Sequence, residues 1–165
     1  FTITNTTRDP RPGEKDGVNH FFVDVDDFVN LIAADELLEW AQVYGNYYGV
    51  PKKQVRDALD AGKHVIIRVD VQGAKRISEI IPGALLIFII PPSLDVLKKH
   101  LKDRGVDSEE EMTKRLAAAN EEISQASLFD FTVTNEEGRL DDTVNSVVNI
   151  IESESQMIPP RNVSF

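Results

Sequence analysis

Short apolar runs that alternate with amphipathic helical segments limit the possible folds of this chain more than any other feature. The runs at residues 64–71, 84–90 and 129–134 are rich in β-branched or aromatic side chains, as in strands buried on both faces of a sheet. Helical periodicity follows each run, and Ser108 with Glu111 has the pattern of a capping box that opens one long helix. Strands that alternate with helices predict an α/β fold whose parallel sheet is flanked by helices.

Residues 9–50 break this rhythm with short strands, turns and one helix. The elements predicted in the first half of the chain are strands at 1–4, 21–23 and 37–43 and helices after Asp24 and at 52–61. We interpret residues 9–50 as a subdomain inserted into one domain that covers about 1–152. Residues 153–165 are predicted to form a weakly ordered tail.

Charge and residue usage limit the partners of such a domain. Asp and Glu number 28 against 18 Lys and Arg, which gives a net charge of −10, so a broad basic face for nucleic acid is not expected. An acidic protein that binds an anion must concentrate its few basic residues locally. The absence of cysteine excludes disulfides and fits a reducing compartment. With no apolar run of membrane-spanning length and no signal-peptide pattern, we expect a cytoplasmic location.

The segment at residues 6–14 carries two arginines, Arg8 and Arg11, on a loop stiffened by prolines. Guanidinium groups suit phosphate oxygens because they stay charged and donate hydrogen bonds in parallel pairs. The spacing alone favours an ordinary solvated loop over a phosphate site.

The same segment, with Gly17 after it, resembles the guanylate kinase signature Thr-Thr-Arg-x-Pro-Arg-x-Gly-Glu-x-x-Gly. Further motifs of that family occur in the same order along nearly the whole chain. They are Phe22-Val23, Leu38-Glu39-Trp40-Ala41, Gly45-Asn46-Tyr47-Tyr48-Gly49, Asp70-Val71-Gln72-Gly73, Pro91-Pro92-Ser93, Arg104-Gly105 and Lys114-Arg115-Leu116. Several separate motifs in the right order identify the chain as a member of the guanylate kinase family.

The family transfers a phosphoryl group from ATP to GMP, so the resemblance implies GMP and ATP as partners, with Mg²⁺ bound to ATP. It implies a P-loop kinase-type fold in which residues at about 9–50 form a GMP-binding subdomain and residues at about 100–118 form a helical lid. The positions implied to hold the phosphate of GMP are Arg8, Arg11, His20 and Tyr48, with His20 in place of a tyrosine of the family.

Base recognition is assigned by the resemblance to Glu39, which would accept hydrogen bonds from the guanine N1 and amino groups. Guanine presents two adjacent donors on one edge, and a carboxylate offers two acceptors, whereas adenine lacks that donor pair. The resemblance also implies that the Thr4 hydroxyl reaches the base and that Asp70 ends a parallel strand, where α/β folds gather ligands. Each position has an ordinary alternative: Glu39 as a surface carboxylate, Tyr48 as one of a packing pair with Tyr47, and Asp70 as a cap.

Arg104 and Arg115 lie on either side of the capping box, in the segment from which the lid arginines of the family close over the donor phosphates. Phosphoryl transfer depends mainly on positioning and charge neutralisation, so the resemblance implies catalytic roles for both and for Arg8. The alternative is a solvated helix face on which acidic residues such as Glu111 pair with Lys114 and Arg115.

On the ATP side, Asn135 ends the run at 129–134 and matches a position near the adenine pocket of the family. The glycine-rich loop G-x-x-x-x-G-K-[ST] of the family does not occur from Phe1 onward. The strand before that loop is central to the sheet of the family, so we expect the physical protein to carry this segment before Phe1. An intact mass of 18.5 kDa would contradict that expectation.

Four positions depart from the family pattern: His20, Val50, Arg68 and His100. Val50 stands where Ser or Thr usually helps to read the base, and Arg68 reverses a charge near GMP. The resemblance predicts a guanylate kinase, a nucleoside monophosphate kinase that makes ADP and GDP. The first alternative is a catalytically weakened binding module for GMP or a phosphopeptide, and the second is a kinase for another nucleotide.

Overall fold

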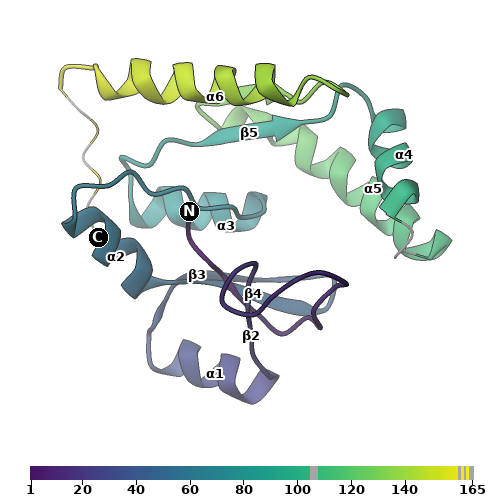
Figure 1. Cartoon of the computed structure of the whole chain (residues 1–165), viewed down its shortest axis with the longest axis horizontal. Helices are drawn as coiled ribbons and strands as arrows, with labels where there is room; N and C mark the ends of the chain where they lie inside the picture. The colour runs from purple at the N-terminus through teal and green to yellow at the C-terminus, as the bar shows by residue number, and fades with distance from the viewer. Residues whose placement is uncertain (105–107, 160, 162, 164–165) are drawn as a thin grey trace. The chain divides into compact units, whose positions relative to one another are not determined.

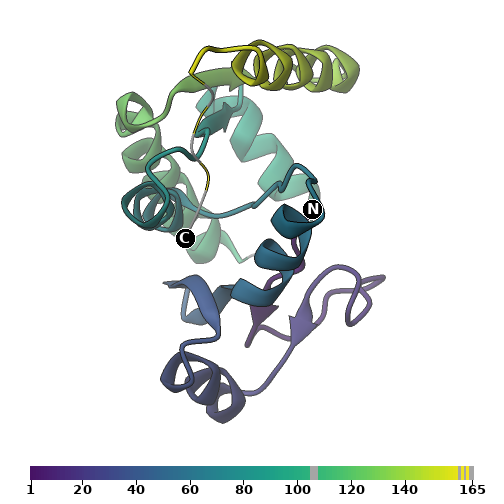
Figure 2. The same ribbon diagram turned by 90° about the vertical axis from the view of Figure 1, so that its left-hand side faces the viewer.

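The computed structural model describes residues 1–104, 108–159, 161 and 163, with the side chain of Arg104 outside that description. The chain divides into two compact units, Phe1–Glu79 and Ile80–Phe165, which we call the N-terminal and C-terminal units. Each unit combines strands with helices, and Figures 1 and 2 show these elements from two directions.

A four-stranded mixed sheet forms the centre of the N-terminal unit. Its order is β2-β1-β4-β3, with β1 parallel to β2 and antiparallel to β4, and with β3 antiparallel to β4. The elements are β1 (Asn5–Thr6), β2 (Phe21–Phe22), α1 (Val25–Ala33), β3 (Leu37–Val43), β4 (Asn46–Pro51), α2 (Lys52–Asp60) and α3 (Val71–Ile80). The predicted mixed-strand character of this region, its edge strand at β2 and its strand at β3 are confirmed.

A tight turn joins β3 to β4 and fixes how the two strands pair. Its residues 44–45 have φ angles of 49° and 83°, as in the hairpin turns whose twist matches that of the strands. In the resulting register Glu39 lies opposite Val50, and Ala41 lies opposite Tyr48. Because side chains alternate along a strand, Glu39 and Tyr48 point to the same face of the sheet. The local sequence thus brings two predicted site residues to one face.

Helix α1 packs on the hairpin through Phe28. The side chain of Asp24 caps this helix, as predicted, by accepting a hydrogen bond from the Asp27 N–H at 2.7 Å. Phe28 is completely buried and stacks on the ring of Tyr47 with 5.2 Å between the ring centroids. Gly49 has no side chain, and this leaves the space that Phe28 occupies.

We expect Gly49→Ala to destabilise the N-terminal unit. A Cβ atom there would lie 2.7 Å from Leu37 Cδ1 and 3.0 Å from Phe28 Cζ, and both of those side chains are buried. Overpacking of a core costs about 1–3 kcal/mol. Equilibrium urea unfolding measures the loss, and an unchanged midpoint would show that the core accepts the extra methyl group.

The predicted strands at 1–4 and 64–71 are not formed. Strand β1 begins only at Asn5, after the first of these ranges. Residues 64–70 of the second range stay irregular up to the start of α3. The Thr2 N–H donates to the Ile66 carbonyl at 3.0 Å, and the side chain of Ile66 is 52% exposed. A β-branched run shows that side chains suit a sheet, but a strand also needs a ladder of backbone partners, which one bond does not supply.

The C-terminal unit contains two parallel strands and the helices that pack on them. Its elements are β5 (Ile87–Ile90), α4 (Leu94–Arg104), α5 (Glu109–Ser124), the 3₁₀ turn η1 (Ala126–Leu128), β6 (Phe131–Thr134) and α6 (Leu140–Ser155). The parallel pairing of β5 with β6 confirms the parallel α/β arrangement predicted from the alternation. Helix α6 packs on β6, and α4 packs against α5 (Figure 1).

Strands β5 and β6 are shorter and less buried than the sequence predicted. They begin at Ile87 and Phe131, and the side chain of Ile89 in β5 is 53% exposed. In β6 only Val133 is buried. An apolar run therefore identifies a strand here, but it does not show how many of its faces are covered.

Past the predicted domain end at residue 152, α6 continues to Ser155. Arg161, in the segment predicted as a weakly ordered tail, forms ion pairs with Glu154 at 2.6 Å and with Asp130 at 3.3 Å. None of the helices in the described residues is long and apolar enough to cross a membrane.

Candidate functional site

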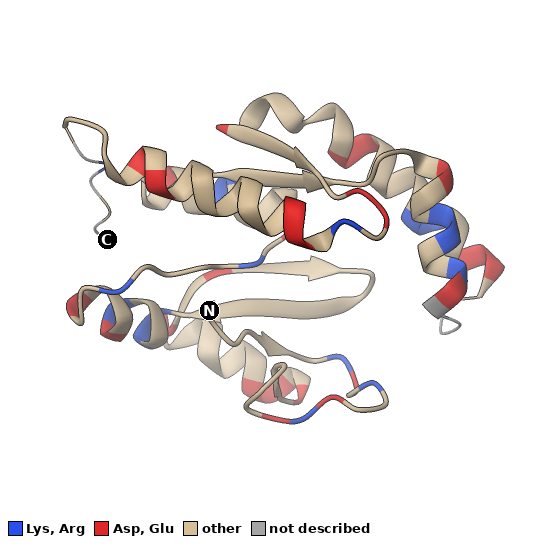
Figure 3. Ribbon diagram, turned by 45° about the horizontal axis from the view of Figure 1, so that its top comes forward, with Lys and Arg blue, Asp and Glu red and all other residues tan. Residues whose placement is uncertain are grey.

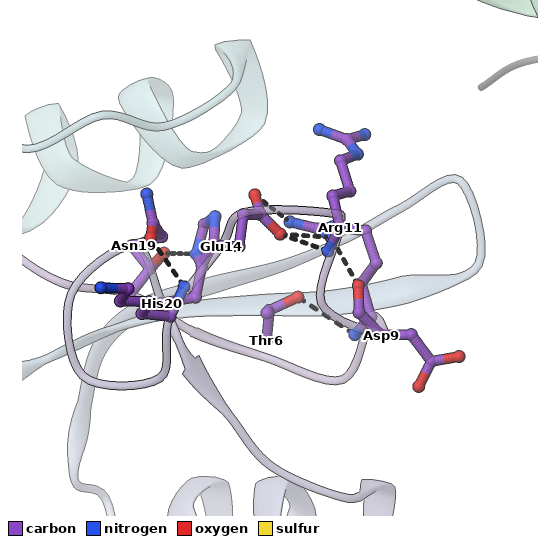
Figure 4. Close-up of polar contacts among 9 residues, drawn as sticks. Thr6, Asp9, Arg11, Glu14, Asn19 and His20 are labelled. Atoms are coloured by element: carbon purple, nitrogen blue, oxygen red, sulfur yellow. Dashed lines mark hydrogen bonds and ion pairs between the residues drawn. The ribbon is translucent and has the colours of Figure 1, made fainter. Parts of the chain in front are cut away.

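The loop after β1 holds its two arginines in different ways. Arg8 forms a two-pronged pair with the Glu14 carboxylate, with N–O distances of 2.9 and 3.0 Å, and the Arg11 backbone N–H donates to the same carboxylate at 2.7 Å. Figure 4 shows Glu14 at the centre of these contacts, with the Arg11 side chain extending away from the loop. The guanidinium of Arg11 forms no ion pair with any described residue, so it is available to an anion.

The fork between Arg8 and Glu14 also fixes the charge of both groups. Their side chains are 13% and 18% exposed. The hydrogen bond from Arg8 is the main reason that the pKa of Glu14 falls to about 2, and the Arg11 N–H adds to it. The Arg8 guanidinium is therefore held in one orientation before any ligand binds.

A second cluster is formed by Thr4 and His20, each directly before its strand (β1 and β2), and by Tyr48 in β4. The Thr4 hydroxyl lies 2.8 Å from His20 Nδ1, and the rings of His20 and Tyr48 meet edge to face at 6.1 Å. Burial, followed by the nearby charges of Arg8 and Arg68, lowers the pKa of His20, so the ring is neutral at pH 7. The donor and acceptor roles of the Thr4 hydroxyl and Nδ1 depend on the tautomer, and in the neutral tautomer protonated at Nε2 that atom can donate to an anion.

Glu39 is a buried carboxylate, so the alternative of a surface side chain is wrong. It is 5% exposed, and its Oε2 atom has no hydrogen-bond partner among the described residues. Burial and the nearby charge of Asp70 raise its pKa to about 7, while Arg76 acts in the opposite direction. A buried acceptor without a donor is unfavourable, and a ligand that brings hydrogen-bond donors would relieve it.

The alternatives for Asp70 and for the tyrosine pair are also resolved by the contacts. Asp70 caps α3, because its Oδ1 accepts the Gly73 N–H at 2.9 Å, and its charge acts on Glu39 as well. Tyr47 packs on Phe28, whereas Tyr48 approaches His20 on the other face, so the two tyrosines do not form one packing pair.

The structure shows where two of the residues that depart from the family pattern lie, one in the core and one on the surface. Val50, where the family usually has a hydroxyl, is completely buried. Arg68 is exposed, with its guanidinium 5.5 Å from the centroid of the Phe1 ring. Arg68 therefore adds positive charge near His20 and does not enter the core.

The residues predicted for the ATP side belong to the C-terminal unit. Asn135 Oδ1 accepts the Thr143 hydroxyl at 3.0 Å, and its backbone N–H donates to Ile90 at 2.8 Å. Arg115 is half-buried on α5, and the side chain of Arg104 lies outside the described residues. Figure 3 shows the basic residues that gather along α4, where His100 is half-buried.

The capping box at the start of α5 is confirmed. The Glu111 N–H donates to Ser108 Oγ, and the Ser108 N–H donates to the Glu111 carboxylate at 2.8 Å. Lys114 pairs with Glu110 at 2.6 Å on an exposed face, which confirms the solvated-face alternative for that lysine.

Sequence reasoning assigned no role to three residues that lie against or act on predicted site residues: Glu14, Gly73 and Arg76. Glu14 belongs to the arginine motif, and its opposite charge on the same short loop is a signal that could have identified it. Gly73 and Arg76 lie more than 30 positions from Glu39, and no local pattern connects them to it.

The parallel strands with their helices, the arginine loop and a buried carboxylate oxygen that no described residue pairs are features that fit an α/β protein of the nucleotide-kinase class. Within that class, the family model described as guanylate kinase matches residues 1–154. The chain belongs to the guanylate kinase family. Similarity and fold thus confirm the predicted guanylate kinase function and enzyme class, and they favour it over the binding module.

Relatives and a solved structure agree with this assignment. The guanylate kinase of Carboxydothermus hydrogenoformans is 41% identical over all of this chain and 79% of its own length. That of Prochlorococcus marinus is 43% identical over 93% of this chain and 82% of its own length. The crystal structure of guanylate kinase from Anaplasma phagocytophilum matches 94% of this chain and 76% of its own, with a TM-score of 0.81 and 32% identity.

Proposed function

We propose that this chain transfers the γ-phosphoryl group of ATP to GMP, and that the N-terminal unit holds GMP through the residues named above. Arg8, Arg11, His20 and Tyr48 bind the phosphate, and Glu39 binds the guanine edge. The observation that carries the proposal is the unpaired Oε2 of the buried Glu39. Two adjacent guanine donors match the two oxygens of a carboxylate, so GMP satisfies an acceptor that the described residues leave open.

The arginine loop serves the reaction by holding charge in place. A phosphate oxygen of GMP attacks the γ-phosphorus of ATP, and the bond from that phosphorus to the bridging oxygen of ADP breaks. Arg8, oriented by Glu14, and Arg11, whose guanidinium pairs with no described residue, offset the negative charge of the attacking phosphate. The neutral His20 ring contributes a donor without adding charge.

On the ATP side we propose that Arg104 and Arg115 bind the donor phosphates from a lid at about 100–118, and that Asn135 lies near the adenine. Asp70 helps to bind GMP from the start of α3. Mg²⁺ bound to ATP would supply charge neutralisation there. The described residues contain no cluster of three His, Asp or Glu side chains suited to a metal, so no protein ligand is assigned to it.

The direct test is a coupled assay of ADP formation by the full-length protein with ATP and Mg²⁺. We expect ADP only when GMP is present, and much less with AMP, which lacks the donor pair that Glu39 accepts. Binding of GMP without GMP-dependent ADP would favour the binding module instead.

A further inference from the structure

Helix α3 contacts two consecutive residues of β3 through two of its own residues one turn apart. An ideal Cβ atom on Gly73 would lie 2.9 Å from Glu39 Oε2 and 3.0 Å from Glu39 Cδ. The Arg76 guanidinium donates to the Trp40 carbonyl and lies 5.2 Å from the centroid of the Trp40 ring. Residues three apart share a helix face, so one face of α3 contacts β3 at Glu39 and Trp40.

Gly73 makes room for the Glu39 carboxylate. Its φ angle lies outside the left-handed region, so the backbone does not require glycine there. Alanine is the better helix former, and close approach therefore explains the glycine better than propensity does. The added Cβ would also lie 2.8 Å from Val69 Cβ, an atom tied to its own backbone. The Glu39 side chain is the neighbour that can move, so a methyl group at position 73 would displace the carboxylate.

Arg76 is the positive charge that acts on the buried carboxylate. The charged groups that influence Glu39 are Asp70, directly before α3, and Arg76, six residues farther along and within that helix. Asp70 disfavours the ionised form and Arg76 favours it. Although Arg76 is exposed, its planar group is held by both the carbonyl and the ring of Trp40, so its position is defined.

We propose that α3 positions Glu39 for base recognition: Gly73 leaves the space that the carboxylate occupies, and Arg76, held on Trp40, supplies its countercharge. The inference rests on the proposed role of Glu39 in reading guanine. It adds two positioning residues that touch neither the base nor the phosphate.

The charge part of the proposal is tested with Arg76→Gln, with Lys75→Gln as the matched control. Lys75 is the adjacent exposed residue of α3, and it is not among the groups that act on Glu39. We measure the titration of the Glu39 carboxyl by ¹³C NMR in the ligand-free protein, and the affinity for GMP from pH 6 to 9. Arg76→Gln should move both profiles to higher pH and weaken GMP binding severalfold at pH 7. Lys75→Gln should move neither, and Arg76→Lys should restore part of the effect.

The space part is tested with Gly73→Ala, which should weaken GMP binding about tenfold while the far-ultraviolet circular dichroism stays unchanged. This inference would be overturned if Arg76→Gln changed neither the titration of Glu39 nor the affinity for GMP, while Glu39→Gln still lost GMP binding. The proposed function would then remain. Unchanged GMP affinity in Glu39→Gln would overturn the guanine assignment itself. If Gly73→Ala fails to fold, Arg76→Gln and Arg76→Lys still test whether α3 positions Glu39 through its countercharge.

Discussion

Glu39→Gln is expected to remove most of the affinity for GMP and to stabilise the ligand-free protein at the same time. The carboxylate offers two acceptors to the two guanine donors, whereas an amide offers one acceptor and opposes the other donor with its own N–H groups. A hydrogen bond to a charged group contributes about 1.5–3 kcal/mol, so affinity should fall on the order of 100-fold.

The gain in stability follows from the raised pKa of Glu39. A carboxyl group with a pKa of 4.5 when unfolded and about 7 when folded binds its proton more tightly in the folded state. The fold therefore loses stability as the pH rises from about 4.5 to about 7, and it stays at the lower level above that range. The full shift corresponds to at most about 3 kcal/mol, which the glutamine variant should recover above pH 7.

Two measurements check these opposite effects. Calorimetric titration with GMP at pH 8 gives the affinity, and urea unfolding between pH 4.5 and 8 gives the difference in stability. Glu36→Gln is the matched control, because Glu36 is exposed and lies three residues before Glu39. The interpretation would be wrong if the variant bound GMP normally, or if its stability relative to wild type did not change with pH.

The same pKa predicts how GMP affinity depends on pH in the unmodified protein. Only the ionised carboxylate accepts both guanine donors, so affinity should fall by up to about tenfold per pH unit below about 7. The donors of the bound base favour the ionised form, so binding near pH 7 should release a proton. Calorimetry in buffers of different ionisation enthalpy measures that release, and a flat profile from pH 6 to 8 would contradict the assignment.

Local chemistry in the sequence was enough to predict the strand at 37–43, the caps and the long helix after Ser108. The caps at Asp24 and Ser108 form as predicted because each depends on residues within a few positions. The strand at 64–71 failed for the opposite reason, since its partners must come from elsewhere in the chain. The apolar pattern contains no information about them.

The site shows the same division between local and distant causes. The motifs identified Arg8, Arg11 and Glu39, but the sequence did not show that Glu39 is buried with an oxygen that no described residue pairs. The environment of Glu39 depends on α3, which lies more than 30 positions farther along the chain. Gly73 in this helix has no side chain and leaves space for the carboxylate, and Arg76 supplies a positive charge. Residue identity fixed the candidate chemistry, and the tertiary contacts fixed its charge state.

The second large effect is expected from the arginine loop, where Arg8→Gln and Arg11→Gln should differ. Both remove a charged contact to the phosphate of GMP, worth about 1.5–3 kcal/mol, so each should weaken GMP binding roughly 10- to 100-fold. Neither should change the affinity for guanosine, which has the same base without the phosphate. Equal losses for GMP and guanosine would show that the two arginines do not bind the phosphate.

Only Arg8→Gln should also lower the stability of the protein. Because the folded-state pKa of Glu14 is lowered from 4.5 to about 2, its stabilisation is present above about pH 4.5 and is lost as the pH falls toward about 2. After allowance for solvent screening, removal of Arg8 should cost about 1–2 kcal/mol at pH 7 and clearly less at pH 3. Arg11→Gln serves as the matched control, because no described residue pairs with its guanidinium. Urea unfolding of the three proteins at pH 7 and pH 3 measures the difference, and a similar loss of stability in both variants would mean that the fork between Arg8 and Glu14 does not hold the loop.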